Sequence, residues 1–195
     1  MLSLPILPKY LNRSFALLLF KEKDKFLRQA ARRALWLPGP ATQSINFGGA
    51  DIELLIPQRD PFLMIDAITS VDYEQQALEG VRRINPDNPV FAGHFPGNPI
   101  YPGVLHIETM GQLGLCLLQL QRQKNNGADL EKLKMPDFRL VRIYDAVFLA
   151  PVLPGDELTV RTLTLEDNGL TLIMAGQISR GETFCTVTIM EVYYA

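Results

Sequence analysis

The sequence predicts an α+β fold in which an antiparallel sheet of five or six strands wraps around one long central helix. The apolar residues of segment 102–120 point in nearly every direction around a helical axis, which predicts a helix buried on most sides. From residue 138 to the C-terminus, segments rich in β-branched and aromatic residues alternate with turn sequences. Because a flat layer would cover only one face of such a helix, the sheet must curve around it.

The first 44 residues are expected to form a basic helical extension ahead of a main domain that spans residues 45–195. Residues 1–37 carry a net charge of +6, whereas the whole chain carries −2. Apolar residues recur at helical spacing over residues 21–37, which predicts an amphipathic helix that ends before the Pro-Gly-Pro sequence at 38–40. Three interpretations stay open: packing on its own domain or an oligomer partner, docking to an acidic partner protein, and peripheral contact with an anionic membrane surface.

Composition argues against several functional classes. The longest apolar run of the extension, residues 15–20, is shorter than the roughly 18–20 residues that span a bilayer, and charged residues follow it directly. Secretion is therefore disfavoured, while an Arg-rich transit peptide stays open. Nucleic acid is not expected as a partner, because the basic charge lies on the extension without a groove-binding motif. Two cysteines and two histidines are too few for a zinc finger or a disulfide framework, so we expect no metal and a cytoplasmic location.

The main domain is expected to begin in extended structure from Ile52, where a short apolar segment ends at Pro57. Two strands follow on either side of a polar stretch near Asp72, at residues 63–68 and 77–84. Beyond the long helix, four strands are expected at residues 138–148, 157–165, 170–179 and 183–193. The Asn-Gly and Arg-Gly sequences that separate the last three of these strands suit tight hairpin turns, because Gly and Asn tolerate positive φ. These strands predict an antiparallel meander.

The residues that could take part in catalysis lie around the start of the long helix. His94 lies in the turn-rich loop 91–99, and Glu108 lies about a turn and a half inside the helix, where Gln112 at i+4 shares its face and could orient the carboxyl group. Burial on an apolar helix is expected to raise the pKa of Glu108, so that it acts as an acid beside an imidazole base. The loop 100–103 supplies unpaired N–H groups and the positive end of the helix dipole for an oxyanion. Together these groups fit proton abstraction α to a thioester carbonyl followed by loss of a β-hydroxyl.

Simpler interpretations of these groups stay open. A loop histidine is often a turn residue with a satisfied hydrogen bond, and a helix glutamate is often solvated. His106 points to a different side of the helix from Glu108 and is expected to be structural. Cys116 and Cys185 are expected to be small core residues, since neither has a visible histidine partner.

Three segments of the chain resemble the FabZ-type 3-hydroxyacyl-acyl carrier protein dehydratases of fatty-acid synthesis. They are IPQRDPFLMID at 56–66, GHFPGNPIYPGVLHIETMGQ at 93–112 and PVLPGD at 151–156, within a match over roughly residues 52–193. The resemblance implies a hot-dog fold that pairs into a homodimer through a continuous sheet and often assembles further. It also implies dehydration of 3-hydroxyacyl thioesters to trans-2-enoyl thioesters. The substrate would arrive on the phosphopantetheine arm of an acyl carrier protein, with no metal or redox cofactor.

By this resemblance, His94 and Glu108 form the catalytic pair and reach one site from different subunits. His94 would take the C2 proton, and Glu108 would protonate the departing hydroxyl. The backbone N–H of Gly103 would bind the thioester carbonyl. The expected substrate-binding residues are completed by Phe95, Pro102 and Gln112.

The chain departs from the family pattern at positions that bear on its partners. Gln58 stands where the family has histidine, and Thr109 and Gly111 replace alanines. Leu149 and Ala150 stand where the family has basic residues, which would suit an acidic carrier protein. The basic extension, which compact members lack, is a hypothetical substitute for that charge.

Three functions are therefore compared. The first is a dehydratase of housekeeping fatty-acid synthesis or of a specialised polyketide or polyene pathway. The second is a catalytically silent acyl-binding or carrier-protein-binding hot-dog protein, and the third is a hot-dog thioesterase. Retention of both His94 and Glu108 favours the dehydratase.

Overall fold

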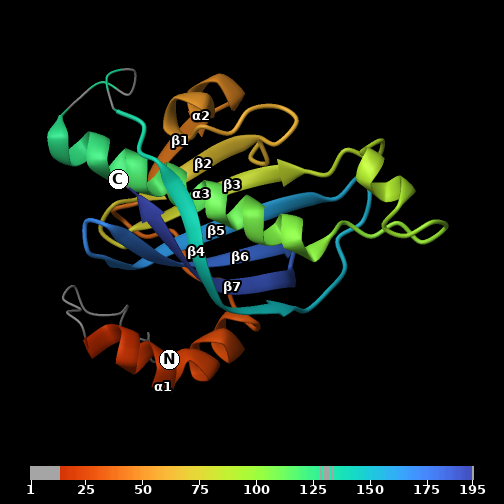
Figure 1. Cartoon of the computed structure of the whole chain (residues 1–195), viewed down its shortest axis with the longest axis horizontal. Coiled ribbons are helices and arrows are strands. Elements are labelled where there is room, and N and C mark those ends of the chain that lie inside the picture. The colour runs from red at the N-terminus through yellow and green to blue at the C-terminus, as the bar shows by residue number, and fades with distance from the viewer. Residues whose placement is uncertain (1–13, 128, 130–131, 133, 195) are drawn as a thin grey trace.

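A computed structural model of the chain describes residues 14–127, 129, 132 and 134–194. The described residues form one antiparallel sheet of seven strands, with strand order β1-β2-β3-β5-β6-β7-β4 (Figure 1). In chain order the elements are α1 (Ser14–Ala30), β1 (Gln43–Phe47), α2 (Gly49–Leu55), β2 (Ala67–Asp72), β3 (Ala77–Arg83), η1 (Pro89–Ala92), α3 (Gly103–Asn126), β4 (Phe138–Phe148), β5 (Glu157–Asp167), β6 (Thr171–Arg180) and β7 (Thr183–Tyr194). Two strands, β1 and β4, are the edges of this sheet.

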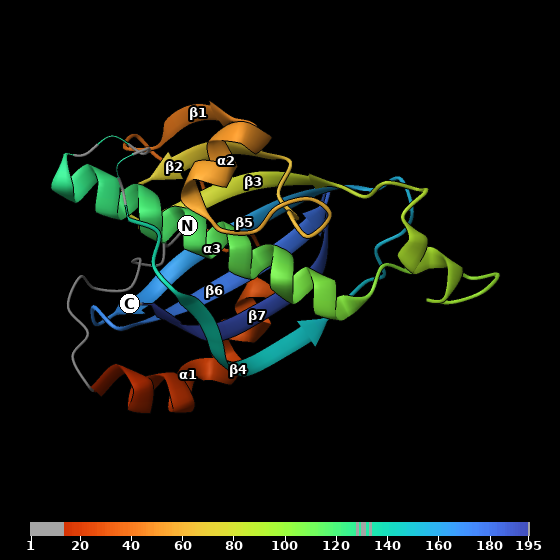
Figure 2. The same ribbon diagram turned by 45° about the horizontal axis from the view of Figure 1, so that its top comes forward.

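The sheet curves around α3, which lies across one of its faces (Figure 2). Every residue from Gln112 to Leu120 is buried, so all sides of the helix are covered there. Its leucines share one apolar core with inward residues of the sheet and with Ile52 and Leu55 of α2. This arrangement confirms the predicted α+β fold with a helix wrapped by an antiparallel sheet.

Gly176 of β6 lets α3 approach the middle of the sheet closely. A Cβ atom at this position would lie 2.7 Å from the Cβ of Met110, an atom that side-chain rotation cannot move away. We expect Gly176→Ala to lower the free energy of unfolding by about 1–3 kcal/mol, measured by urea denaturation. In the matched control Gly111→Ala, the new Cβ would meet only the Met190 sulfur at 3.5 Å. Alanine should stabilise that helical position by up to about 1 kcal/mol, and equal stability of the two variants would contradict this packing.

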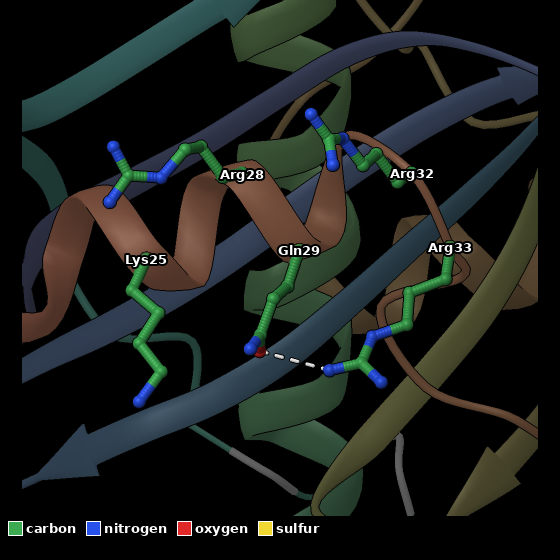
Figure 3. A pocket seen from close by; sticks show the side chains of 5 residues that line it. All are labelled: Lys25, Arg28, Gln29, Arg32 and Arg33. Atoms are coloured by element: carbon green, nitrogen blue, oxygen red, sulfur yellow. Dashed lines mark hydrogen bonds between the residues drawn. The ribbon is translucent and has the colours of Figure 1, made fainter.

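The helix α1 covers the face of the sheet opposite to α3, as the close view of α1 in Figure 3 shows. Leu27 and Ala30 of α1 and the following Trp36 are each 5% exposed. They share a second apolar cluster with outward residues of the strands, namely Ala77, Leu163, Leu165, Ile173, Ala175, Val187 and Ile189. The sheet therefore has both faces covered near its centre.

The segment from Ile52 corrects the sequence prediction, because it forms α2 instead of extended structure. Ile52 and Leu55 are three residues apart and fully buried, so they share one face of a helical turn, while Leu54 is exposed. The Asp51 carboxylate accepts a hydrogen bond from the Gly48 N–H at 2.9 Å, which stabilises the start of the helix. In so short a segment, the alternating apolar residues of a strand cannot be distinguished from the apolar spacing of a helix.

Other boundaries also differ from the prediction. The strand expected at 63–68 lies at 67–72 as β2, and the helix expected over 21–37 is α1, which ends at Ala30. The short strand β1 was not predicted, because its side chains are mostly exposed and its apolar alternation is limited to Ile45 and Phe47. It adds a seventh strand, and the predicted boundary between residues 44 and 45 lies inside it. The first 13 residues of the predicted extension lie outside the described residues.

Candidate active site

The loop after η1 fixes the orientation of His94. The His94 N–H donates to the Val90 carbonyl at 3.0 Å, and the Ile100 N–H donates to the His94 carbonyl at 3.0 Å. The ring atom Nδ1 lies 2.8 Å from the Ile100 carbonyl oxygen. Because a carbonyl can only accept, Nδ1 carries a proton, and in the neutral form of the ring Nε2 is the atom that keeps its lone pair. His94 is half-buried and thus presents Nε2 as a base.

Phe95 and Pro102 flank this loop. The Phe95 ring stacks on the imidazole with a centroid distance of 4.1 Å and is itself 51% exposed. Pro102 is the N-cap of α3, and the preceding Tyr101 donates its N–H to the Val152 carbonyl at 2.8 Å. These contacts fix the course of the chain from His94 to the first turn of the helix.

Gly103 begins α3 in close contact with Phe148 of β4. A Cβ atom on Gly103 would lie 2.6 Å from Cε1 of the Phe148 ring, so no larger residue fits without a shift. The first N–H groups of a helix have no partner within the helix, and the helix dipole adds positive potential there. The start of α3 therefore offers donors for a carbonyl oxygen. The contribution of Phe148 was missed in the sequence, because contact between distant segments leaves no local signal.

Glu108 is held by Gln112, as predicted, and Gln112 is in turn held by the loop at Phe62 and Met64, which the sequence did not reveal. The Gln112 Nε2 donates to Glu108 Oε1 at 2.8 Å and to the Phe62 carbonyl at 2.8 Å. Its Oε1 accepts the Met64 N–H at 2.7 Å, so the orientation of the amide is fixed. Gln112 is 1% exposed and Glu108 is half-buried. This network aims one carboxylate oxygen at Gln112 and leaves the other for a ligand.

The two predicted catalytic side chains do not interact within one chain. In the described part of the structure, no hydrogen bond or ion pair joins His94 to Glu108. Two hollows of about 360 and 240 Å³ lie along α1 and beside the C-terminal part of α3, and neither is lined by these two residues. That His94 and Glu108 meet across two subunits stays a prediction.

The surface beside the start of α3 is apolar and uncovered in one chain. Val104 is 69% exposed and Phe148 is 53% exposed. Leu140 and Val141, toward the opposite end of the edge strand β4, are also exposed. An edge strand presents unpaired N–H and C=O groups, and exposed apolar side chains next to it mark an interaction surface.

The other histidine, His106, is buried in the core. It is 3% exposed, and its Nδ1 lies 2.6 Å from the Thr186 hydroxyl on β7. Its ring stacks beside that of Tyr101 with a centroid distance of 5.7 Å. Burial lowers the pKa of His106 from 6.5 to about 4. These contacts support the structural role that we expected for it.

His106 should make the stability of the protein depend on pH. Its folded pKa lies below the unfolded value, so between pH 6.5 and about 4 the unfolded chain binds a proton that the folded chain does not. The free energy of unfolding should therefore fall as the pH drops through this window, by about 3 kcal/mol at most. Urea denaturation at several pH values measures the slope. His106→Gln, which cannot titrate, should flatten it, whereas an unchanged slope would rule out His106 as its source.

The structure also bears on the predictions about the cysteines, a metal site and a membrane span. Cys116 and Cys185 are free and buried, and burial raises the pKa of both thiols, which disfavours a nucleophilic role. Among the described residues, no group of three or more His, Cys, Asp or Glu side chains is placed to hold a metal ion. None of the described helices is long and apolar enough to span a bilayer.

Comparison with known proteins identifies the family. A family model described as the FabA-like domain matches residues 56–187. The 3-hydroxyacyl-acyl-carrier-protein dehydratase FabZ of Sulfurimonas denitrificans is 37% identical over 127 residues, which cover 65% of this chain and 83% of the relative. The FabZ dehydratase of Mannheimia succiniciproducens is 36% identical over 142 residues, which cover 72% of this chain and 88% of the relative.

A solved structure shows the same fold. The dehydratase heterocomplex ApeI:P from Xenorhabdus doucetiae matches with a TM-score of 0.59 at 15% identity, over 74% of this chain and 90% of that chain. At this identity the likeness concerns the fold alone. The matched domain and the sequence relatives show that the chain belongs to the FabA-like family and is a relative of the FabZ 3-hydroxyacyl-acyl-carrier-protein dehydratases.

Proposed function

We propose that this protein removes water from 3-hydroxyacyl thioesters on an acyl carrier protein and releases trans-2-enoyl thioesters. The observation that carries the proposal is the imidazole of His94, whose Nδ1 is bound to the Ile100 carbonyl and whose Nε2 is thereby left as a base. The carboxyl group of Glu108, oriented by Gln112, supplies the second group that an elimination needs. The sequence relatives named above carry the same activity in their names.

The proposed reaction couples two proton transfers. His94 Nε2 removes a proton from C2, and the electron pair left there forms the C2–C3 double bond as the C3–O bond breaks. Protonated Glu108 gives its proton to the departing hydroxyl, which leaves as water. The first N–H groups of α3, from Gly103 onward, stabilise the negative charge on the thioester oxygen. Proton transfer from the imidazolium back to the carboxylate, through solvent, restores both groups.

Phe95 and Pro102 are proposed to border the substrate. The Phe95 ring stacks on the imidazole, and its exposed part would contact the pantetheine arm or the first acyl carbons. Pro102 keeps the entry to α3 extended, with φ −61° and ψ 130°. The proposed chemistry uses only side-chain and backbone groups of the protein, and the phosphopantetheine arrives with the substrate.

We further propose that the active unit is a homodimer paired through β4. Its free edge and the exposed Leu140, Val141 and Phe148 are the features that support this pairing. Since Phe148 contacts Gly103, a partner seated on β4 would lie beside the start of α3. Such a partner could supply the second member of the His94–Glu108 pair.

One assay distinguishes this function from the two others considered. The full-length protein is incubated with a 3-hydroxyacyl pantetheine thioester, while enoyl absorbance and free thiol are followed together. We expect enoyl product without thiol release. Thiol release would favour a thioesterase, and the absence of both signals would favour a silent acyl-binding protein.

A further inference from the structure

We propose that the exposed basic face of α1 is the docking surface for the acidic carrier protein that presents the substrate, an inference that rests on the proposed function. The basic face consists of Lys25 and Arg28 of α1 and of Arg32 and Arg33 in the turn that follows it, which with Gln29 line a hollow of about 360 Å³. Figure 3 shows Arg28 and Arg32 extending to one side of the helix axis, and Lys25 and Arg33 to the other. All four side chains are exposed.

The helix that carries this face is anchored to the sheet. The buried Gln177 of β6 donates through Nε2 to the carbonyls of Ala30 at 2.5 Å and Arg33 at 2.9 Å. Its Oε1 accepts the Leu35 N–H at 2.9 Å, so the amide is satisfied by the chain at the end of α1. Near the middle of the helix, Lys23 pairs with Asp145 of β4 at 2.8 Å. The cations are thus presented by a fixed element, which lowers the entropy lost on binding.

The packing of α1 favours a protein partner over a membrane. A helix that lies in a lipid interface buries an apolar face in the bilayer. In α1 the apolar residues Leu27 and Ala30, and Trp36 beyond it, already lie against the sheet. From residue 22 to residue 36 the exposed side chains are all charged. Between residues 22 and 36 this surface can bind by electrostatics, and the exposed apolar residue next to it is the single Leu37, at 68% exposure.

Three of the four cations on this face have no acidic partner among the described residues. Cations of the main domain form ion pairs, as in Arg59–Glu53, Arg82–Asp66, Arg83–Glu157, Arg161–Glu79 and Arg180–Asp156. Among the described residues, Arg28 and Arg32 have no carboxylate partner, and Arg33 donates only to the neutral Gln29 at 2.9 Å. Lys25 alone meets an acid, Glu22, at 3.3 Å on the open surface.

Repulsion among the cations of this face indicates the kind of partner that would bind it. Arg28 lies in the last turn of α1, and Arg32 and Arg33 lie in the turn that follows, so three like charges stand within six positions of the chain and repel one another. A cation in the last turn complements the helix dipole, but that effect fades within a turn and leaves Lys25, Arg32 and Arg33 unexplained. Residues 38–195 carry a net charge of −8, so an acidic protein is repelled by the main domain and attracted by α1. An array of carboxylates on the partner would neutralise the exposed cations.

Charge reversal with a matched control tests this assignment. Arg28→Glu/Arg32→Glu reverses two cations of the basic face, and Lys132→Glu/Lys134→Glu reverses two exposed cations between α3 and β4. Both variants lower the net charge equally. With substrate on the carrier protein at low salt, the first variant should raise KM about tenfold with little change in kcat. The second variant should resemble the wild type, and added salt should reduce the difference between the variants.

Three further outcomes decide between explanations. Both variants should act on the pantetheine thioester as the wild type does, because that substrate does not need the docking surface. Equal KM values of the two variants for the carrier-bound substrate would overturn the proposal, as would binding of anionic phosphatidylserine vesicles by the wild type without binding of the carrier protein. Binding of the unacylated carrier, measured by fluorescence anisotropy, needs no turnover. If binding depends on Arg28 and Arg32 but no enoyl product forms, the docking surface stands and the proposed reaction fails.

Discussion

Replacement of His94 with alanine is expected to lower kcat for dehydration by about 10²–10⁴-fold, the usual contribution of a positioned general base. The hydrogen bond from Nδ1 to the Ile100 carbonyl leaves Nε2 as the basic atom of the ring, and alanine removes it. The rate is measured as the growth of enoyl absorbance with a 3-hydroxyacyl pantetheine thioester. That substrate keeps the measurement independent of carrier docking.

The second histidine provides the matched control for this prediction. His106→Gln removes an imidazole from the core, where Gln can still bond to Thr186, and should keep most of the activity at neutral pH. Circular dichroism verifies that both variants are folded. Activity of His94→Ala close to that of the wild type would exclude His94 as the base. A comparable loss in both variants would indicate a general effect on the start of α3.

Glu108→Gln is expected to lower kcat by a similar factor, about 10²–10⁴-fold, because it removes the proton donor and keeps the shape of the side chain. The amide oxygen of the new side chain can still accept from Gln112 Nε2, so the network with Phe62 and Met64 should persist. Enoyl formation and thiol release are followed together. The enoyl signal should fall to background, and thiol release should stay at background as in the wild type.

An exposed glutamate provides the control for the charge change. Glu182→Gln alters the hairpin between β6 and β7 and should leave kcat unchanged. Thiol release by Glu108→Gln would indicate thioester hydrolysis that does not need this carboxyl group, contrary to the proposed elimination. Full dehydration by this variant would show that the departing hydroxyl takes its proton from elsewhere.

The central features of the fold could be predicted because they depend on local patterns. The apolar residues around α3 required burial on every side, and Asn168-Gly169 marked a hairpin that the structure places between β5 and β6. The position of His94 just before the helix followed from its turn-rich loop. These signals lie within one turn, one loop or one helix.

The remaining features depend on contacts between distant segments. The hydrogen bonds from Gln112 to Phe62 and from Met64 to Gln112 cross about 50 residues of chain, so no spacing rule reveals them. The same holds for Phe148 against Gly103. Gln177 satisfies the backbone at the end of α1 from nearly 150 residues away, which is why the end of the helix was misplaced. The partner that we propose on the β4 edge likewise leaves no local signal in the sequence.

Subunit complementation tests most directly whether His94 and Glu108 act together at a shared site. Equal amounts of His94→Ala and Glu108→Gln chains are refolded together, and dehydration of the pantetheine thioester is compared with that of each variant alone. A mixed dimer whose sites form between subunits contains one intact pair, so the mixture should recover about one quarter of wild-type activity. A mixture in which mixed dimers form, yet which stays as inactive as its two components, would contradict the shared site.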